Sequence, residues 1–138
     1  MKIEINSTLT ECEMHVRKTV FTDEQGLVDV PDEVDETATH FILKDEEGNA
    51  IGVLRVFTNE NGEYALGRLA VLKQYRKQGF GKMLLNSAEK HVKENGGTQL
   101  LLHSQLEAVG FYASCGYSQK TKPDKVQGVM HVWMEKNL

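Results

Sequence analysis

Residues 74–82 read Gln-Tyr-Arg-Lys-Gln-Gly-Phe-Gly-Lys and join a predicted strand over 63–72 to a predicted helix over 81–95. The glycines at 79 and 81 permit positive φ angles, and the first N–H groups of a helix are free to bind an anion. Positive charge is added at the same place by Arg76, Lys77 and Lys82. The stretch therefore predicts a cradle for a diphosphate at the start of a helix.

The spacing of this loop excludes two common nucleotide-binding motifs. There is no G-x-x-x-x-G-K-[ST] sequence, and Leu84 stands where a dinucleotide-binding fingerprint needs its third small residue. Neither ATP nor NAD is favoured as the ligand. A tight turn that leads into a helix and binds nothing is the plain structural alternative for the two glycines.

The front of the chain predicts a strand, a helix and a loop. Residues 2–5 alternate like a strand, and Thr8-Leu-Thr-Glu11 offers a capping box for a helix that should end near Phe21. The acidic stretch 31–36 interrupts the periodicity and is expected to be a loop.

Strands dominate the rest of the chain. Between Thr39 and Phe57 two apolar segments flank a turn, and a second turn at 59–62 leads into the strand over 63–72, which together predict an antiparallel meander. Later elements are a strand over 98–103, a short helix over 105–114 and a strand over 129–135. The helix over 81–95 has the length of a βαβ crossover, so one strand pair should be parallel. The fold class is α/β, with a mixed, mostly antiparallel central sheet.

Composition favours one globular domain over residues 1–138, since the chain has 40% hydrophobic residues and only 2 prolines. The net charge of −4 and the scattered Lys and Arg side chains predict no nucleic-acid partner. No apolar run approaches the ~20 residues of a membrane span, so no membrane association is expected. The 2 cysteines and the charged first residues suggest a cytoplasmic protein with reduced thiols.

Two motifs resemble one family. Arg76-x-x-Gly79-x-Gly81 matches the [QR]-x-x-G-x-[GA] signature of the GNAT superfamily of N-acetyltransferases, and residues 105–117 resemble its second motif, N-x-x-A-x-x-[FL]-Y, with Gln105 in place of the usual Asn. The segment Arg17-x-x-Val20-Phe21-x-x-Glu24-Gln25-Gly26, with Asp35 and His40, is similar to a subgroup of small bacterial members that includes the ElaA-like proteins. The resemblance covers nearly the whole chain.

This resemblance implies the acyl-CoA N-acyltransferase fold, with helices on both faces of the sheet, and transfer of an acetyl group from acetyl-CoA directly to a primary amine of a small molecule or peptide. The pantetheine arm would lie between the central strands, and the diphosphate would lie on the glycine loop. The implied cofactor site comprises Leu69, Ala70, Val71, Arg76, Lys77, Gln78, Gly79, Phe80, Gly81, Lys82, Gln105 and Tyr112.

Tyr112 occupies the position of the family's general acid. A phenol, of ordinary pKa ~10, can hydrogen-bond or protonate a departing thiolate whose conjugate acid has a pKa near ~8.5. The alternative is that Phe111 and Tyr112 only anchor a short helix on the sheet.

The family's usual general base is missing, because Gly67 or Arg68 stands where the family often carries a Glu on its fourth strand. His103 is the histidine nearest the expected cleft and is the candidate to accept the proton of the amine. A strand-end histidine satisfied by the backbone is the alternative. Glu24 is a weaker candidate that would otherwise line the acceptor pocket.

Arg68 interrupts an apolar strand, so it should either pair with Asp35 or Glu24 or meet an acidic acceptor. The expected acceptor-binding residues are Glu24, Arg68 and His103.

Two other functions stay open at this point. One is a catalytically weak acyl-CoA-binding regulatory module, suggested by the missing carboxylate, and the other is a nucleotide-phosphate binder of another fold. The scattered histidines and the lack of a C-x-x-C pair predict no metal site. Cys115 should only pack. A homodimer contact could involve Trp133 and Met134, although residues of this kind more often belong to the core.

Overall fold

The computed structural model describes all of residues 1–138 and is built on an eight-stranded sheet of order β1-β2-β3-β4-β5-β8-β6, with β7 paired to β8. Only β4 and β5 run parallel; the other neighbours are antiparallel. The strands are β1 (Lys2–Asn6), β2 (Thr39–Lys44), β3 (Ala50–Thr58), β4 (Tyr64–Val71), β5 (Gln99–Gln105), β6 (Ser118–Gln119), β7 (Asp124–Val126) and β8 (Val129–Asn137).

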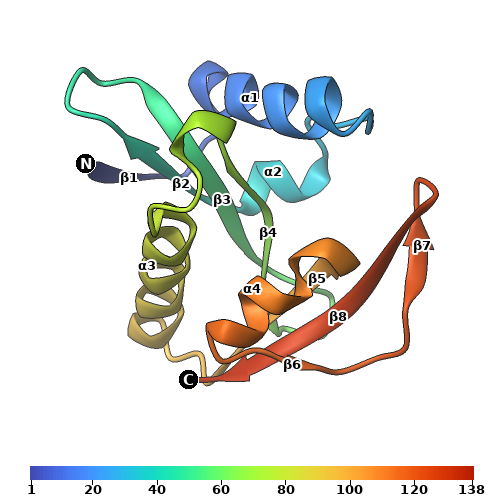
Figure 1. Ribbon diagram of the computed structural model, residues 1–138. Coiled ribbons are helices and arrows are strands. Elements are labelled where there is room, and N and C mark those ends of the chain that lie inside the picture. The colour runs from blue at the N-terminus through green and yellow to red at the C-terminus, as the bar shows by residue number, and fades with distance from the viewer.

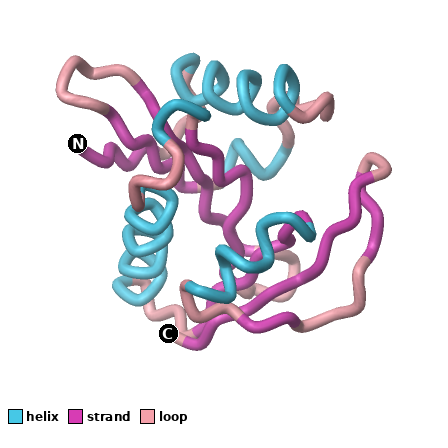
Figure 2. Tube along the Cα trace, in the orientation of Figure 1, coloured by secondary structure: helices cyan, strands magenta, loops and turns pink.

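Helices cover both faces of this sheet (Figures 1 and 2). They are α1 (Glu11–Arg17), which continues as a π-helix (Lys18–Glu24), α2 (Glu33–Thr37), α3 (Phe80–Glu94) and α4 (Val109–Ser114), with 3-10 turns at Lys73–Tyr75 and Leu106–Ala108. The mixed α/β class predicted from the sequence is confirmed. None of the helices is both long and apolar enough to cross a membrane.

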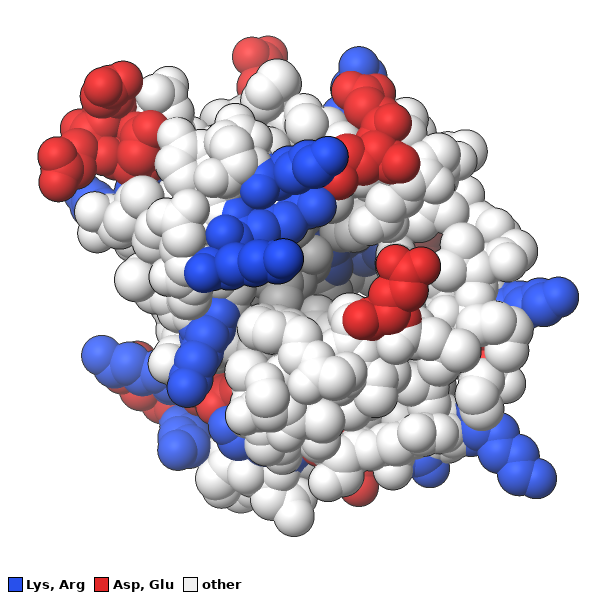
Figure 3. Space-filling model, in the orientation of Figure 1, with Lys and Arg blue, Asp and Glu red and all other residues white.

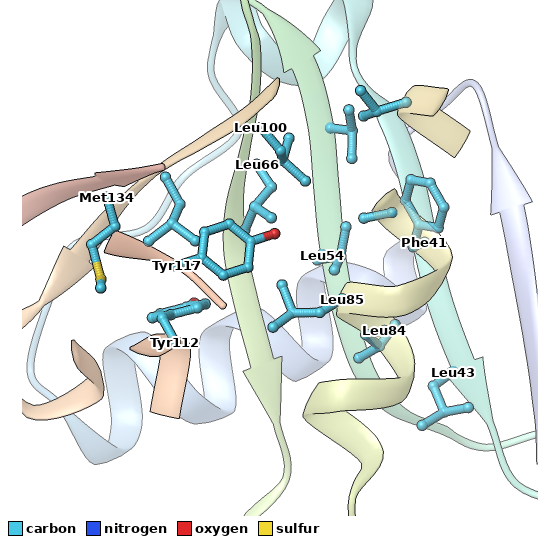
Figure 4. Close-up of a cluster of buried hydrophobic side chains, with 14 of the residues drawn as sticks. Phe41, Leu43, Leu54, Leu66, Leu84, Leu85, Leu100, Tyr112, Tyr117 and Met134 are labelled. Carbon is cyan, nitrogen blue, oxygen red and sulfur yellow. The ribbon is translucent and has the colours of Figure 1, made fainter. Parts of the chain in front are cut away.

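Alternation along the strands divides the core into two parts. On β2, Phe41 and Leu43 pack with Leu84 and Leu85 of α3, while Ile42 packs with Val16 of α1 on the opposite face. Figure 4 shows the larger cluster, in which α3 and α4 meet the sheet. Every second residue of the strand and one apolar face of α3 are therefore buried against each other.

The front of the chain differs from its prediction at two points. The first helix is capped by Thr10, whose hydroxyl accepts a hydrogen bond from the N–H of Glu13, so the predicted capping box at Thr8 is wrong by two residues. The acidic stretch is not a loop: Asp32 and Asp35 form a reciprocal capping box that begins α2. This box satisfies helix-end N–H groups, which is why a short acidic segment is helical.

Close packing at the end of α3 requires a glycine at position 97. A Cβ atom at Gly97 would lie 2.8 Å from Cδ2 of Tyr64 and would overlap Val92 as well. This close approach lets the chain turn directly from α3 into β5.

Strands β4 and β5 separate soon after they meet. They pair only at Ala65 with Leu101 and at Leu66 with Leu102. On the other side of β4, the register shifts between Val53 and Arg55 of β3, and Arg68 has a φ of 53°. This β-bulge bends β4 away from β5. The sheet is thereby opened at its centre.

Candidate active site

A cavity of about 220 Å³ occupies the opening between β4 and β5. Its walls come from both strands, from the segment that follows the π-helix, from α4 and from the tip of the β7–β8 hairpin. In the space-filling view this region is a hollow with Lys and Arg side chains grouped beside it (Figure 3). The lining residues are Phe21, Gln25, Leu27, Val28, Asp29, Leu66, Gly67, Arg68, Leu69, Leu102, His103, Ser104, Gln105, Ala108, Tyr112, Val126, Gln127 and His131.

Tyr112 lines this cavity from α4. Its side chain packs edge-on against Phe111 and Tyr117, and the residue is only 8% exposed. No group of the protein forms a hydrogen bond with its hydroxyl, and the hydroxyl oxygen retains some exposure to solvent. Burial, with a smaller contribution from Cys115, raises the pKa of Tyr112 above its ordinary value. The hydroxyl is therefore an accessible, protonated donor.

His103 lies across the cavity on β5. Its ring is stacked on Trp133, with centroids 4.5 Å apart, and its Nε2 donates to Oδ1 of Asp124 at 2.8 Å. This bond leaves Nδ1 as the nitrogen with a free lone pair in the neutral ring. The alternative of a histidine satisfied by the backbone is wrong, because a carboxylate is the partner.

A second imidazole, His131, was missed in the sequence. Its Nδ1 donates to the carbonyl of Val129 at 2.9 Å, and its ring centroid lies 4.8 Å from that of His103. The signal was available, since alternation along β8 places His131 and Trp133 on one face. What could not be foreseen was that β5 pairs with β8 and so brings the two histidines together.

The glycine loop forms the start of α3 as predicted. Gly79 is the N-terminal cap with a φ of 85°, no side chain caps the helix, and its first i→i−4 bond runs from the N–H of Met83 to the carbonyl of Gly79. The N–H groups of Phe80, Gly81 and Lys82 precede that bond and have no partner of this kind. A side chain at Gly81 would approach the ring of Phe111 to 3.2 Å. The turn fits a phosphate group that needs several N–H donors.

The residues expected to bind the cofactor differ in what their side chains contact. Leu69 lines the cavity, while Ala70 is buried toward α1 and Val71 continues the strand. Phe80 packs on Tyr75, with ring centroids 6.4 Å apart, and joins the large core cluster. Gln78 bonds back to the carbonyl of Gln74 at 3.4 Å. Lys77 has a φ of 62°, and its side chain has no ion pair.

The guanidinium of Arg76 is bound within the protein. Its Nη atoms donate to both carboxylate oxygens of Glu24, at 2.8 and 3.0 Å, and its Nε donates to the carbonyl of Val71 at 2.9 Å. Glu24 is thereby held at the glycine loop and is not among the residues that line the cavity.

Neighbouring residues make two further links across the cavity. Gln105, which replaces the family's Asn, donates to Oε1 of Gln25 at 2.8 Å. The side-chain amide of Gln127, at the hairpin tip, both accepts from the N–H of Val28 at 2.9 Å and donates to its carbonyl at 3.0 Å. We call residues 24–28 the roof segment, because they connect the glycine loop, the end of β5 and the hairpin.

A buried ionic network holds the segment that follows the roof. Arg17 is fully buried and forms a bidentate pair with Asp29, at 2.9 and 2.9 Å, and a pair with Asp35 at 2.8 Å. Although burial alone would raise the pKa of each aspartate, the hydrogen bonds from Arg17 outweigh it and hold both values below their ordinary range. Arg68 joins the network through Asp29, at 3.1 Å, and not through Asp35 or Glu24 as predicted.

His40 and Glu13 complete this network. Both carboxylate oxygens of Glu13 lie within 3.1 Å of Nδ1 of His40, and Nε2 of His40 donates to the carbonyl of Asp35 at 2.9 Å. Burial raises the pKa of Glu13. Glu13, Asp35 and His40 are close enough together to resemble a metal site; Asp35 and one carboxylate oxygen of Glu13 are bound by Arg17, while Oε1 of Glu13 approaches Nδ1 of His40 at 2.9 Å without forming a hydrogen bond. The motif around Arg17 is thus explained by a structural network.

Comparison with known proteins agrees with this geometry. The model of the acetyltransferase (GNAT) domain matches residues 12–138. A protein of Bacillus subtilis (strain 168), provisionally named an acetyltransferase, is 34% identical over 144 residues, which cover 97% of this chain and 96% of the relative. The chain belongs to the GNAT family of acetyltransferases and is an acyltransferase enzyme, as the sequence motifs predicted.

Solved structures show the same fold. A provisionally assigned N-acetyltransferase from Lactobacillus plantarum superimposes with a TM-score of 0.90 at 28% identity, covering 99% of this chain and 97% of the other. Escherichia coli ElaA follows with a TM-score of 0.82 at 21% identity and coverage of 98% and 99%. A family member from Elizabethkingia anophelis, described with acetyl-CoA bound, has a TM-score of 0.76 at 14% identity and coverage of 99% and 97%.

Proposed function

We propose that this protein is an acetyl-CoA-dependent N-acetyltransferase that transfers the acetyl group directly to a primary amine of a small molecule or peptide. The observation that carries this proposal is that one cavity, at the opening between β4 and β5, contains both an accessible phenol and an imidazole that is oriented by a carboxylate. The helix start that carries free N–H groups lies beside α4, the helix of Tyr112, because a Cβ atom at Gly81 would meet the ring of Phe111 at 3.2 Å. Acetyl-CoA would supply the activated thioester.

The roles of the chain's own residues follow from their contacts. Tyr112 donates a hydrogen bond or a proton to the departing sulfur, and burial keeps it protonated. His103 accepts the proton of the amine at Nδ1, while Asp124 stabilises the imidazolium through Nε2. A lysine-like amine of ordinary pKa ~10.4 is mostly protonated at neutral pH and therefore needs such an acceptor.

For the cofactor, the N–H groups at the start of α3 and the side chains of Lys77 and Lys82 would hold the diphosphate. The backbone of β4 from Leu69 to Val71, unpaired on the side that faces β5, is where the pantetheine arm would align. Gln105 and Tyr112, which line the cavity, would contact the arm. Arg76 contributes by shaping the turn, since its charge is matched by Glu24.

We also propose a cytoplasmic location, because both cysteines are free thiols.

The test is acetyl-CoA binding followed by a thiol-release screen against amino acids, polyamines, aminosugars and peptides. We expect ~2.7 kcal/mol of stabilisation at a hundredfold excess of acetyl-CoA over its Kd, and free thiol with one acceptor class. Binding without thiol release in any arm would indicate the alternative, a regulatory acyl-CoA-binding module. Stabilisation by ATP instead would indicate a nucleotide binder.

A charge reversal tests the cofactor loop. Lys82→Glu, alone or with Lys77→Glu, should weaken acetyl-CoA binding about tenfold or more, because a carboxylate then faces the diphosphate. Lys90→Glu is the matched control, since Lys90 lies on the same helix with a 77% exposed side chain that only approaches Glu94. Equal affinities in both variants would contradict the assigned cofactor loop.

A further inference from the structure

The charged groups that line the cavity differ in how completely they are paired. Arg68 is the only Lys or Arg among the lining residues and Asp29 is the only Asp or Glu. Positively charged atoms are visible inside the hollow in Figure 3. The balance between these two side chains therefore sets the permanent charge of the cavity wall, beside the titratable imidazoles of His103 and His131.

Asp29 is fully occupied. Its Oδ1 accepts from Nη2 of Arg17 at 2.9 Å and from Nε of Arg68 at 3.1 Å, and its Oδ2 accepts from Nε of Arg17 at 2.9 Å. Its side chain is 4% exposed. A second amino group on an acceptor would thus find no free carboxylate on the cavity wall.

Arg68 is incompletely paired. Apart from Asp29, its nearest acid is Asp32 at 3.6 Å, and Asp32 already accepts two hydrogen bonds from Arg55, at 2.7 and 3.2 Å. No group of the protein forms a hydrogen bond with Nη1 or Nη2 of Arg68. Both nitrogen atoms retain some exposure to solvent. The β-bulge places this side chain at the cavity with 37% of its surface exposed. The outer edge of the guanidinium is free for a ligand.

We propose that the acceptor amine carries an anionic group, a carboxylate or a phosphate, which is bound by Nη1 and Nη2 of Arg68. This inference rests on the proposed function and narrows its acceptor class. A guanidinium edge binds such groups through paired, charge-assisted hydrogen bonds. Polyamines are disfavoured, because the cavity wall offers them one incompletely paired cation and no free carboxylate.

The experiment uses acceptors that differ only in the anionic group. One arm compares amino acids with their carboxamides, and another compares aminosugar phosphates with the free aminosugars, so the arms distinguish carboxylate from phosphate. The anionic member of at least one pair should have a kcat/KM about ten- to a hundredfold higher. Arg68→Gln should bring that ratio close to one, Arg68→Lys should retain part of it, and the KM for acetyl-CoA should stay unchanged.

The two variants are comparable because residue 68 has a positive φ, a strain that Gln and Lys share. A wild-type preference for the neutral member of every pair would overturn the proposal. So would an equal loss on both members in Arg68→Gln with normal melting behaviour.

Binding provides a second readout that needs no turnover. In the presence of coenzyme A, N-acetyl amino acids should bind the wild type more tightly than their amides by calorimetry, or N-acetyl aminosugar phosphates more tightly than the free N-acetyl aminosugars, and Arg68→Gln should remove the difference. Equal binding within both pairs, or no binding by any member of either pair, would overturn the proposal. Failure of the proposed function is recognised separately, by the absence of acetyl-CoA binding or of thiol release with any amine.

Discussion

Glu24 and Arg76 form a bidentate ion pair, at 2.8 and 3.0 Å, between the roof segment and the turn that begins α3. The first residue begins the roof segment, of which Gln25, Leu27 and Val28 line the cavity, and the second belongs to the loop expected to hold the diphosphate. Because Nε of Arg76 is also bonded to the carbonyl of Val71 at 2.9 Å, the side chain fastens three segments together.

A charge swap tests this link. Glu24→Arg or Arg76→Glu alone should cost only about 0.2–1 kcal/mol of unfolding free energy, since the pair is partly exposed, but should raise the acceptor KM several-fold. The double variant should recover most of the loss, because the pair re-forms in reverse. If the side chain of Arg76 bound the diphosphate instead, the double variant would keep a weakened affinity for acetyl-CoA.

Tyr112→Phe tests the general acid. It should lower kcat by about 10²- to 10⁴-fold and leave acetyl-CoA affinity unchanged, because only the proton donor is lost. Burial raises the pKa of Tyr112, so the wild-type rate should not fall through ionisation of this residue near pH 10.

The matched control for this substitution is Tyr117→Phe. Tyr117 donates to Glu89 at 3.0 Å and does not line the cavity, so its loss should cost about 1 kcal/mol of unfolding free energy and leave kcat nearly unchanged. A Tyr112→Phe enzyme with full activity on its best acceptor would remove Tyr112 from the mechanism.

The ionic network predicts acid sensitivity. Asp35 has a folded-state pKa below its ordinary value, so its stabilising contribution is complete above about pH 4 and is lost as the pH falls below that. Asp35→Asn should therefore lower the unfolding free energy by about 3–5 kcal/mol at pH 7, and the difference from wild type should shrink at pH 3.

Urea titrations at several pH values measure this difference. Asp23→Asn is the control, because its partner Lys18 lies 3.8 Å away and both side chains are exposed; it should change stability by less than about 0.5 kcal/mol. A difference for Asp35→Asn that stays constant from pH 7 to pH 3 would contradict the assigned ionic role.

Gly97→Ala should destabilise the protein by about 1–3 kcal/mol, because its methyl group would overlap Val92 and Tyr64 at the end of α3. Gly110→Ala should instead be neutral or slightly stabilising, since a Cβ atom there meets nothing within 4 Å and the residue lies in α4. Thermal melting of the two variants gives the comparison. Equal melting temperatures would show that α3 and β5 can shift apart at no cost.

Much of the fold was predictable because local patterns in the sequence coincide with the strands, helices and turns that form. The turns at 45–49 and 59–62, the glycines after α3 and the alternation predicted for residues 2–5 and 129–135 each agree with the structure. The π-helix and the short strand β7 were not predicted, since neither has a period that separates it from a regular helix or a loop. The helical form of 33–37 depended on a capping box that an acidic run conceals.

The candidate site was predictable where it follows a linear motif, as at the start of α3 and at Tyr112. It was not predictable where distant segments meet. His131 reaches His103 only through the β5–β8 pairing, and Gln127 reaches Val28 across 99 residues of sequence. The partner of Arg68 depended on where Arg17 holds Asp29, which no spacing in the sequence indicates.

Two hydrogen bonds between the side chain of Gln127 and the backbone of Val28 join the hairpin tip to the roof segment. Both segments contribute little to the hydrophobic core, and Val28 and Val126 are exposed. Exchanges of residues in these segments should therefore cost little folding free energy. Family members could acquire different acceptors by varying the roof segment, the hairpin tip and the side chain at position 68, while the backbone of β4 and the start of α3 stay constant. Acceptor choice and coenzyme handling would then diverge independently within one scaffold.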